Sequence, residues 1–456
     1  MSAISPARAL AFDVVRATFE QDAFTERAFR EGAGVRRIGG RERAQAQRLA
    51  YGAVQRRGTS DAAVERLSDR SPRLLDPPVL AGLRLGLYEL LFADATPDHA
   101  AVDQAVELVK RAGAAHAAGL VNAVLRRAAR ERDELTAALL GDDSTPELAS
   151  VADSAPPWLA RMWWEELGAD SARSLLAACN RPPEVAFRID KGDRAETIAA
   201  LAETGVEARA PEAGWPLALP ETIVIEGRTG DFVPNRVAAG ELTPQSRGSA
   251  AVVELLDPQP DEHVLDLCAG PGIKTGQLAE RMGNRGEVIS VELDGERAAE
   301  VAEQARRLGL RSVIVIEADA AEMELAPGFD RVLVDAPCSD LGALASRPDA
   351  RWRKSPRSIE RLVEVQDRLL RRAVGMLRPG GVLVYATCTI SRRENEDRVA
   401  ALLEAADAGE VPAIAVEDLG ERAPRLASPH DSRFLQIRPD RDCTTGFFIS
   451  RLRRND

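Results

Sequence analysis

The sequence predicts a multidomain protein with three parts: an all-α bundle over residues 1–140, a small α+β domain over 157–240, and an α/β domain over 241–456. Three observations support this division. The 456 residues exceed what one ordinary hydrophobic core holds. Apolar residues recur at helical spacing in the front of the chain, and strand and helix patterns alternate in its last half. An apolar content of 45% and a charged content of 29% are those of a globular protein.

The front of the chain has the pattern of helices. Phe12, Val15 and Phe19 recur at helical spacing, as do the leucines of residues 83–91. Alanine is frequent and runs of β-branched residues are few, which favours helix over strand. We therefore expect a bundle of about five to seven helices. Its turns are predicted at Gly32–Gly34, Gly39–Gly40 and Asp76–Pro78.

A linker is predicted after the bundle, because residues 141–146 and 153–157 are rich in Gly, Asp, Ser and Pro. The small domain follows it. Helical patterns at 158–167 and 171–178 precede a strand pattern at 185–189, which indicates mixed α and β structure.

The last part alternates strand and helix patterns, which predicts a parallel, doubly wound sheet. Such sheets bind ligands in the crevice beyond the carboxyl ends of their strands. The expected strands are residues 263–267, 287–292, 312–316, 331–335 and 382–386, and residues 446–452 are expected to add a final antiparallel strand.

The cysteine count and the apolar runs exclude several classes of protein. Five widely spaced cysteines do not fit a disulfide framework or a zinc site, so no metal is expected. No apolar run reaches the roughly 18 residues of a membrane span, and the first residues lack the layout of a signal peptide. We therefore expect a cytoplasmic protein with reduced thiols and no membrane partner.

Charge gives a mixed indication about nucleic acid. The net charge of −12 argues mildly against it. Residues 346–372, however, hold nine Arg or Lys against four acidic residues. A solvated helix face is one interpretation of this basic segment, but its position after a candidate site favours a phosphate-contacting surface that includes Arg351, Arg353 and Lys354.

A glycine-rich turn follows the first strand of the last part. Residues 265–272 read Leu-Asp-Leu-Cys-Ala-Gly-Pro-Gly, and Gly270 and Gly272 let the backbone approach a ligand closely. The next two strands end near Glu292 and Asp319, which suit ribose hydroxyls and an adenine amino group. A lone acid is more commonly a surface carboxylate, but these two, together with the aspartate before the turn, favour a nucleoside site. Because the G-x-G-x-x-G fingerprint is absent, S-adenosyl-L-methionine is favoured over NAD.

Two cysteines follow the next two predicted strands. Cys338 ends the sequence Asp-Ala-Pro-Cys that begins at Asp335, and Cys388 lies between two threonines. A thiolate is a strong nucleophile but needs a cationic or hydrogen-bonding neighbour. Lys274 is a candidate for that role or for orienting Asp335. The spacing alone does not rank one thiol above the other.

A methyltransferase needs a thiol when its acceptor is carbon 5 of a pyrimidine, which is a poor nucleophile. Addition of a thiolate at carbon 6 makes carbon 5 enamine-like, so that it accepts a methyl group. A base then removes the carbon 5 proton and the thiol is eliminated. Asp335 suits the hydrogen bond to nitrogen 3 that stabilises the adduct, so Asp and Cys together predict this chemistry.

The motifs resemble those of a known family. They comprise residues 266–275, 335–339, 387–389, 347–349 with Trp352, 393–396 and 446–448, and in the front residues 41–56, 85–90 and 119–126. The motifs between residues 266 and 448 resemble those of the bacterial 16S ribosomal RNA cytosine-C5 methyltransferases of the RsmB (Sun/Fmu) type. The front is similar to the NusB antiterminator fold that this family carries.

The resemblance implies a NusB-like RNA-binding bundle, a small RNA-binding domain and a Rossmann-like methyltransferase domain. It implies that Cys388 is the nucleophile, that Cys338 assists release of the methylated base, and that Asp335 and Lys274 support catalysis. The RNA partner would be 16S ribosomal RNA, and we expect a monomer. The implied contacts to S-adenosyl-L-methionine are Cys268, Ala269, Gly270, Pro271, Gly272, Ile273, Lys274, Glu292, Asp319 and Asp335.

Two residues depart from the family pattern. Ile273 stands where a second glycine is common, and Asp340 follows Pro-Cys-Ser where small residues are usual. Ile273 is expected to crowd the cofactor turn, and Asp340 adds a carboxylate near the expected phosphate-binding surface. Two alternatives stay open: the same chemistry on transfer RNA, or a non-catalytic RNA-binding or antitermination factor. Two positioned thiols argue against the second.

Overall fold

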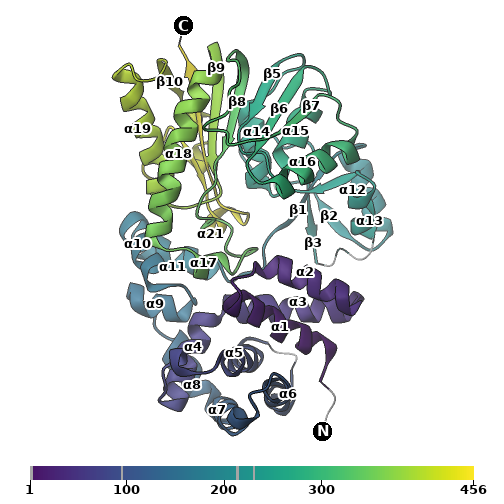
Figure 1. The fold of residues 1–456 in the computed structure, drawn as a ribbon, viewed down its shortest axis with the longest axis vertical. Coiled ribbons are helices and arrows are strands. Elements are labelled where there is room, and N and C mark those ends of the chain that lie inside the picture. Colours follow the sequence, from purple (N-terminus) through teal and green to yellow (C-terminus); the bar gives the residue numbers. More distant parts are fainter. Residues whose placement is uncertain (1–3, 94–95, 212–214, 228, 230–231, 456) are drawn as a thin grey trace. The chain divides into compact units, whose positions relative to one another are not determined.

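The computed structural model (Figure 1) describes residues 4–93, 96–211, 215–227, 229 and 232–455. The chain forms two compact units. The helical unit comprises Met1–Arg181 together with Leu344–Lys354, and the sheet unit comprises Pro182–Ala343 together with Ser355–Asp456. The chain therefore leaves the sheet unit after residue 343 and returns to it at residue 355.

The helical unit is built around one buried helix, α5, which contributes Arg84 and Glu89 as well as apolar residues to the interior. Both charges are paired, since Arg84 donates to Asp61 at 2.7 and 2.8 Å and Glu89 accepts from Arg8 at 2.7 Å. The helices are α1 (Pro6–Glu20), α2 (Thr25–Arg36), α3 (Gly40–Gln55), α4 (Arg57–Ser68), α5 (Pro77–Phe92), α6 (Asp98–Arg111), α7 (Ala118–Arg130), α8 (Arg132–Leu140), α9 (Pro146–Ala152), α10 (Pro157–Leu167), α11 (Ala169–Ala178) and α17 (Ala350–Arg353).

The front is helical as predicted, but two expectations about it are wrong. Residues 4–93 and 96–140 hold eight α-helices rather than five to seven, and two of the breaks between helices are single residues, Arg56 and Glu131. Gly32–Gly34 forms no turn and lies within α2. A Cβ at Gly32 would lie 2.6 Å from the Leu10 side chain, so this glycine allows close packing of two helices. Helices α10 and α11, expected in the small domain, lie in the helical unit.

A four-stranded antiparallel sheet begins the sheet unit, in the order β2-β3-β1-β4. Its apolar residues pack with those of α12 and α13 in a small core of their own. The elements are β1 (Val185–Ile189), α12 (Arg194–Glu203), β2 (Glu207–Arg209), β3 (Thr222–Glu226), α13 (Phe232–Ala238) and β4 (Leu242–Pro244).

The large sheet has the order β10-β12-β9-β8-β5-β6-β7, with β11 paired to β12. Strands β5 to β9 are parallel, and β12 is antiparallel to β9 as predicted. The chain builds outward from β5 to β7 and then returns to place β8 on the other side of β5, which creates a switch point. The strands are β5 (His263–Asp266), β6 (Glu287–Glu292), β7 (Val313–Glu317), β8 (Phe329–Asp335), β9 (Leu377–Thr387), β10 (Ile414–Glu417), β11 (Leu435–Ile437) and β12 (Phe447–Arg454).

Helices cover both faces of this sheet because successive strand residues point to opposite faces. Val264 and Leu333 pack in the core that includes α14 and α15, whereas Leu265 and Val332 pack in the core that includes α18 and α19. All four side chains are fully buried. The helices of this unit are α14 (Arg247–Leu256), α15 (Ile273–Arg281), α16 (Gly295–Leu308), α18 (Pro356–Met376), α19 (Glu396–Asp407), α20 (Leu419–Arg422) and α21 (Pro439–Asp442).

The six strands predicted for the large sheet are confirmed to within five residues at their ends, whereas β10 and β11 of this sheet were not predicted. Both are short strands, of four and three residues, in the antiparallel part of the sheet. Among the described residues, no helix has both the length and the apolar character that crossing a membrane requires.

Candidate active site

The switch point between β5 and β8 carries a buried carboxylate. Asp266, at the end of β5, is 1% exposed, and its Oδ2 accepts a hydrogen bond from the Thr275 hydroxyl at 2.8 Å. Its Oδ1 is buried and has no hydrogen-bond partner among the described residues. Burial raises the pKa of Asp266 to about 7. A buried, unpartnered carboxylate oxygen is suited to a cationic ligand group.

The glycine-rich turn is closed against the end of β6. The Gly270 N–H donates to Glu292 Oε2 at 2.9 Å, and a Cβ at Gly270 would lie 2.3 Å from that oxygen. Gly272 has a φ of +94° and begins α15 as its N-cap. A side chain at residue 270 would therefore displace the Glu292 carboxylate, and the positive φ at residue 272 favours glycine. The backbone carbonyl of Ile273 accepts from Arg188 at 2.7 Å, and the Ile273 side chain is half-buried at the start of α15.

The expected cofactor residues lie along one edge of the sheet. Glu292 ends β6, and Asp319 follows β7, which pairs with β6 in parallel. Glu292 Oε1 accepts from the Asp294 N–H at 3.1 Å, and Asp319 Oδ1 accepts from the Ala321 N–H at 2.9 Å. Each carboxylate thus accepts a hydrogen bond from a backbone N–H of its own loop, and Glu292 accepts a second one from Gly270. Burial raises the pKa of the Cys268 thiol, which makes this cysteine an unreactive part of the turn.

Lys274 and Asp335 connect the cofactor turn to the first thiol loop. The Lys274 ammonium lies 2.5 Å from Asp335 Oδ2 and 5.0 Å from the centre of the Phe447 ring. The two charged side chains are 11% and 26% exposed. Of the two roles expected for Lys274, the observed contact is the one that orients Asp335.

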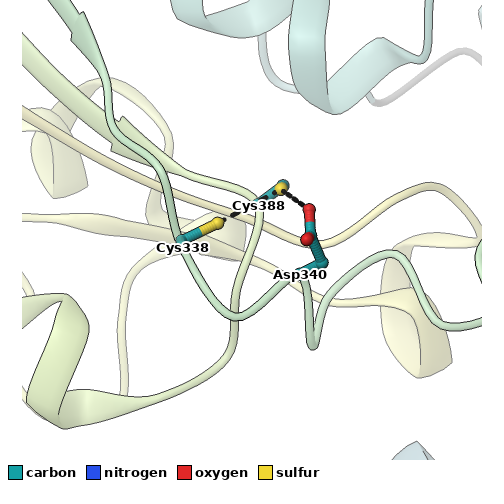
Figure 2. Close-up of side chains that lie close together, drawn as sticks. All are labelled: Cys338, Asp340 and Cys388. Atoms are coloured by element: carbon teal, nitrogen blue, oxygen red, sulfur yellow. Dashed lines mark hydrogen bonds between the residues drawn. The ribbon is translucent and has the colours of Figure 1, made fainter. Parts of the chain in front are cut away.

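The two thiols lie side by side (Figure 2). Cys338 Sγ is 3.3 Å from Cys388 Sγ, and the Cys388 thiol donates to Asp340 Oδ1 at 3.2 Å. Cys338 is buried and Cys388 is half-buried. The hydrogen bond with Cys338 and burial raise the pKa of Cys388 well above its usual value, and the negative charges of Asp340 and Asp335 act in the same direction. Cys388 therefore rests as a thiol.

Four polar residues that were not singled out as site residues hold the two thiol loops together. Glu394 is fully buried and accepts from the Ser339 N–H at 2.9 Å and from the Ser339 hydroxyl at 2.5 Å. Ser339 and Thr389 hydroxyls are 2.7 Å apart. Asn395 accepts from the Thr387 hydroxyl at 2.6 Å and donates to the Thr389 carbonyl at 3.2 Å. The motif at 393–396 is the sequence signal that could have identified Glu394 and Asn395.

The basic segment of residues 346–372 does not form one continuous surface. The prediction that Arg351 belongs to a phosphate-contacting surface is wrong. This side chain is 1% exposed and belongs to the helical unit. Its guanidinium donates to the Cys179 carbonyl at 2.9 Å, the Ser154 carbonyl at 3.0 Å and Asn180 Oδ1 at 3.1 Å. A phosphate contact would require this guanidinium to leave the protein interior, because its donors are directed at backbone and amide oxygens.

Its neighbours are also engaged within the helical unit. The Trp352 indole donates to a backbone carbonyl of α3 at 2.8 Å, and Arg353 pairs with Asp22 at 3.0 Å. The exposed basic residues lie further along, where Arg357 and Arg361 occupy the first turns of α18. Exposed arginines of this basic segment therefore lie on α18, whereas Arg351 and Arg353 are not exposed.

Comparison with known families and proteins gives a consistent result. A family model described as 16S rRNA methyltransferase RsmB/F matches residues 253–453, and a NusB family model matches residues 5–130. The chain is 33% identical to a probable ribosomal RNA small subunit methyltransferase B of Synechocystis sp., over 98% of this chain and 99% of that protein. It is 34% identical to the protein of the same description from Bacillus subtilis, over 89% of each chain.

Two solved structures share the fold. The crystal structure of PH0851 superposes with a TM-score of 0.81 at 24% identity, covering 99% of both chains. That of NSun6 from Pyrococcus horikoshii with SFG superposes with a TM-score of 0.58 at 22% identity, covering 66% of this chain and 98% of the other.

Proposed function

The chain belongs to the RsmB/F family of 16S rRNA methyltransferases, and we propose that it methylates carbon 5 of a cytosine in 16S ribosomal RNA through a covalent cysteine adduct. The observation that carries this proposal is the pair of thiols 3.3 Å apart, beside the ion pair of Asp335 with Lys274. Methylation of an oxygen or nitrogen acceptor requires no thiol, whereas methylation of carbon 5 requires one.

The proposed methyl donor is S-adenosyl-L-methionine, and the turn after β5 fits it. The unpartnered Asp266 Oδ1 suits the ammonium group of the methionine part, and Gly270 leaves room for backbone contact. Glu292 and Asp319 would hold the ribose and the adenine, and residues 268–274 would line the site. When bound, this cofactor supplies an electrophilic methyl group.

The nucleophile is assigned to Cys388 from the family resemblance, and exposure supports that choice. Cys388 is half-buried, whereas Cys338 is 7% exposed. In the proposed reaction Cys388 Sγ adds to carbon 6 of the cytosine. Asp335 lies beside Lys274, and in its protonated form it would donate a hydrogen bond to nitrogen 3 and stabilise the negative charge that addition places on the ring. Cys338 assists the release that follows removal of the carbon 5 proton.

Denaturing electrophoresis with RNA tests the separate roles of the thiols. Cys388→Ala should abolish methyl transfer and form no covalent complex, because carbon 5 is never activated. Cys338→Ala should form the adduct but release it slowly, so that a protein–RNA complex accumulates. Cys443→Ala, which removes an exposed thiol, is the matched control and should behave as the wild type.

RNA containing 5-fluorocytosine gives a second measurement, because fluorine does not leave as a proton and the adduct persists. A complex with Cys388→Ala but none with Cys338→Ala would reverse the two roles. Absence of any complex with the wild type would refute the covalent mechanism. Bisulfite mapping of ribosomal RNA from a deletion strain would identify the cytosine, and unchanged 16S RNA would refute the proposed substrate.

A further inference from the structure

Asp340 is the third member of the thiol cluster, and neither the family resemblance nor the proposed reaction gives it a role. Its Oδ1 lies 3.2 Å from Cys388 Sγ, within hydrogen-bond distance for a thiol donor (Figure 2). The contact joins two loops that follow neighbouring strands, β8 and β9.

The loop that carries Asp340 is fixed in place. The Ala343 N–H donates to the Asp340 carbonyl at 2.9 Å, and the Gly342 N–H donates to the Cys388 carbonyl at 2.9 Å. A Cβ at Gly342 would lie 2.5 Å from the Gly446 carbonyl oxygen, so the backbone here is packed against the start of β12. The carboxylate therefore has a defined position relative to the thiol.

Asp340 occupies a conformation that a smaller residue would adopt more easily. Its φ is +60°, in the left-handed region, which glycine enters freely and which is strained for most other residues. Aspartate and asparagine tolerate this region better than most residues. The backbone thus accepts strain at the position where a carboxylate meets the nucleophile.

The thiol needs an acceptor for its proton. The groups with the largest electrostatic effect on Cys388 are Cys338, Asp340 and Asp335, and all of them disfavour a thiolate. The nearby cation, Lys274, is already paired with Asp335. A free thiolate is therefore costly, and addition is easier if the proton leaves sulfur as the carbon–sulfur bond forms.

We propose that Asp340 is a further catalytic residue, the general base that accepts the Cys388 proton during addition to the pyrimidine ring. This inference rests on the proposed function. The S–H bond breaks and the proton passes to Asp340 Oδ1, while a sulfur electron pair forms the bond to carbon 6. The carbon 5–carbon 6 π pair moves to carbon 5 and the ring. On elimination the carbon–sulfur bond breaks, the carbon 5 proton leaves to a separate base, and Cys388 recovers its proton from Asp340.

The test is the single-turnover rate of adduct formation on saturating 5-fluorocytosine RNA with S-adenosyl-L-methionine, which isolates addition from release. Asp340→Asn keeps the size and the tolerance of a positive φ, and Asp340→Gly relieves the backbone. Both should slow adduct formation at neutral pH by about 100-fold, the usual contribution of a general base. Asp261→Asn, at another left-handed and exposed aspartate (φ +67°), should match the wild type.

The pH profile separates a base from a structural role. In Asp340→Asn the rate should rise about tenfold per pH unit as Cys388 ionises unaided, whereas the wild-type profile should be flatter. Adduct formation by Asp340→Asn at the wild-type rate or faster would overturn the proposal, as would a defect confined to release. These outcomes differ from failure of the proposed function itself, in which the wild type would form no adduct or Cys388→Ala would still form one.

Discussion

Arg351 should be a structural anchor of the helical unit. Its removal should lower the free energy of unfolding of that unit, and this effect should not depend on RNA. Arg351→Met keeps much of the side-chain length and removes the guanidinium. Three of its hydrogen bonds are 3.1 Å or shorter, to Cys179, Ser154 and Asn180. Their oxygens would lose a charged donor in the protein interior.

The expected loss follows from two opposing contributions. Hydrogen bonds from a charged donor contribute about 1.5–3 kcal/mol each, so three contribute roughly 5–9 kcal/mol. Against this, burial lowers the pKa of Arg351 to about 10, which corresponds to a desolvation cost of about 3 kcal/mol. The substitution recovers that cost. The free energy of unfolding of the helical unit should therefore fall by about 2–6 kcal/mol.

Urea unfolding followed by tryptophan fluorescence would measure this loss, because four of the five tryptophans (Trp158, Trp163, Trp164 and Trp352) lie in the helical unit. Arg357→Met removes an exposed arginine and should change stability by less than about 0.5 kcal/mol. If Arg351→Met lost less than about 1 kcal/mol of its free energy of unfolding but bound RNA more weakly, Arg351 would be a phosphate contact and not a structural anchor.

Two further predictions concern charge. Reversal of Arg357 and Arg361 to Glu should weaken RNA binding and lower its salt slope by about 0.7–0.9 for each lost phosphate contact; an unchanged slope in filter-binding titrations would make them solvated residues. Burial raises the pKa of Asp266 to about 7 in the folded protein, from about 3.8 in the unfolded chain. The protonated carboxyl therefore stabilises the fold below about pH 4. This contribution of up to about 4 kcal/mol is lost as the pH rises to about 7. Urea unfolding should therefore show the stability of the wild type relative to Asp266→Asn falling between those pH values, and a constant difference would contradict the buried acid.

The sheet was predictable because its signals are local. Buried parallel strands are short apolar runs, and each ends at a recognisable turn, so the loops at 268–274, 335–339 and 387–389 could be expected at one edge. The basic segment was not predictable in the same way. The local pattern around Arg351 is that of an exposed arginine-rich helix, and its burial depends on carbonyl groups about 170 to 200 residues earlier in the chain.

The thiol cluster shows the same limit at closer range. The sequence indicated two candidate cysteines but could not say that their sulfurs lie 3.3 Å apart, or that Asp340 reaches one of them. That contact depends on a left-handed backbone at residue 340, and a sequence pattern shows only that aspartate tolerates it. The supporting pair Glu394 and Asn395 was visible as a motif, but its role depends on which loops it joins.

The path of the chain connects the helical unit to the thiol loop, so a change in this unit is expected to affect the chemistry as well as RNA affinity. The loop that carries Cys338 and Asp340 ends at Ala343, and the next residue already belongs to the helical unit, where Arg351 holds residues 344–354. A truncated protein that lacks the front would leave these residues without their partners. Loss of turnover in such a truncation would therefore not separate RNA binding from catalysis. Point substitutions at exposed residues of the intact chain are the cleaner test, because they leave the anchor and the thiol loop in place.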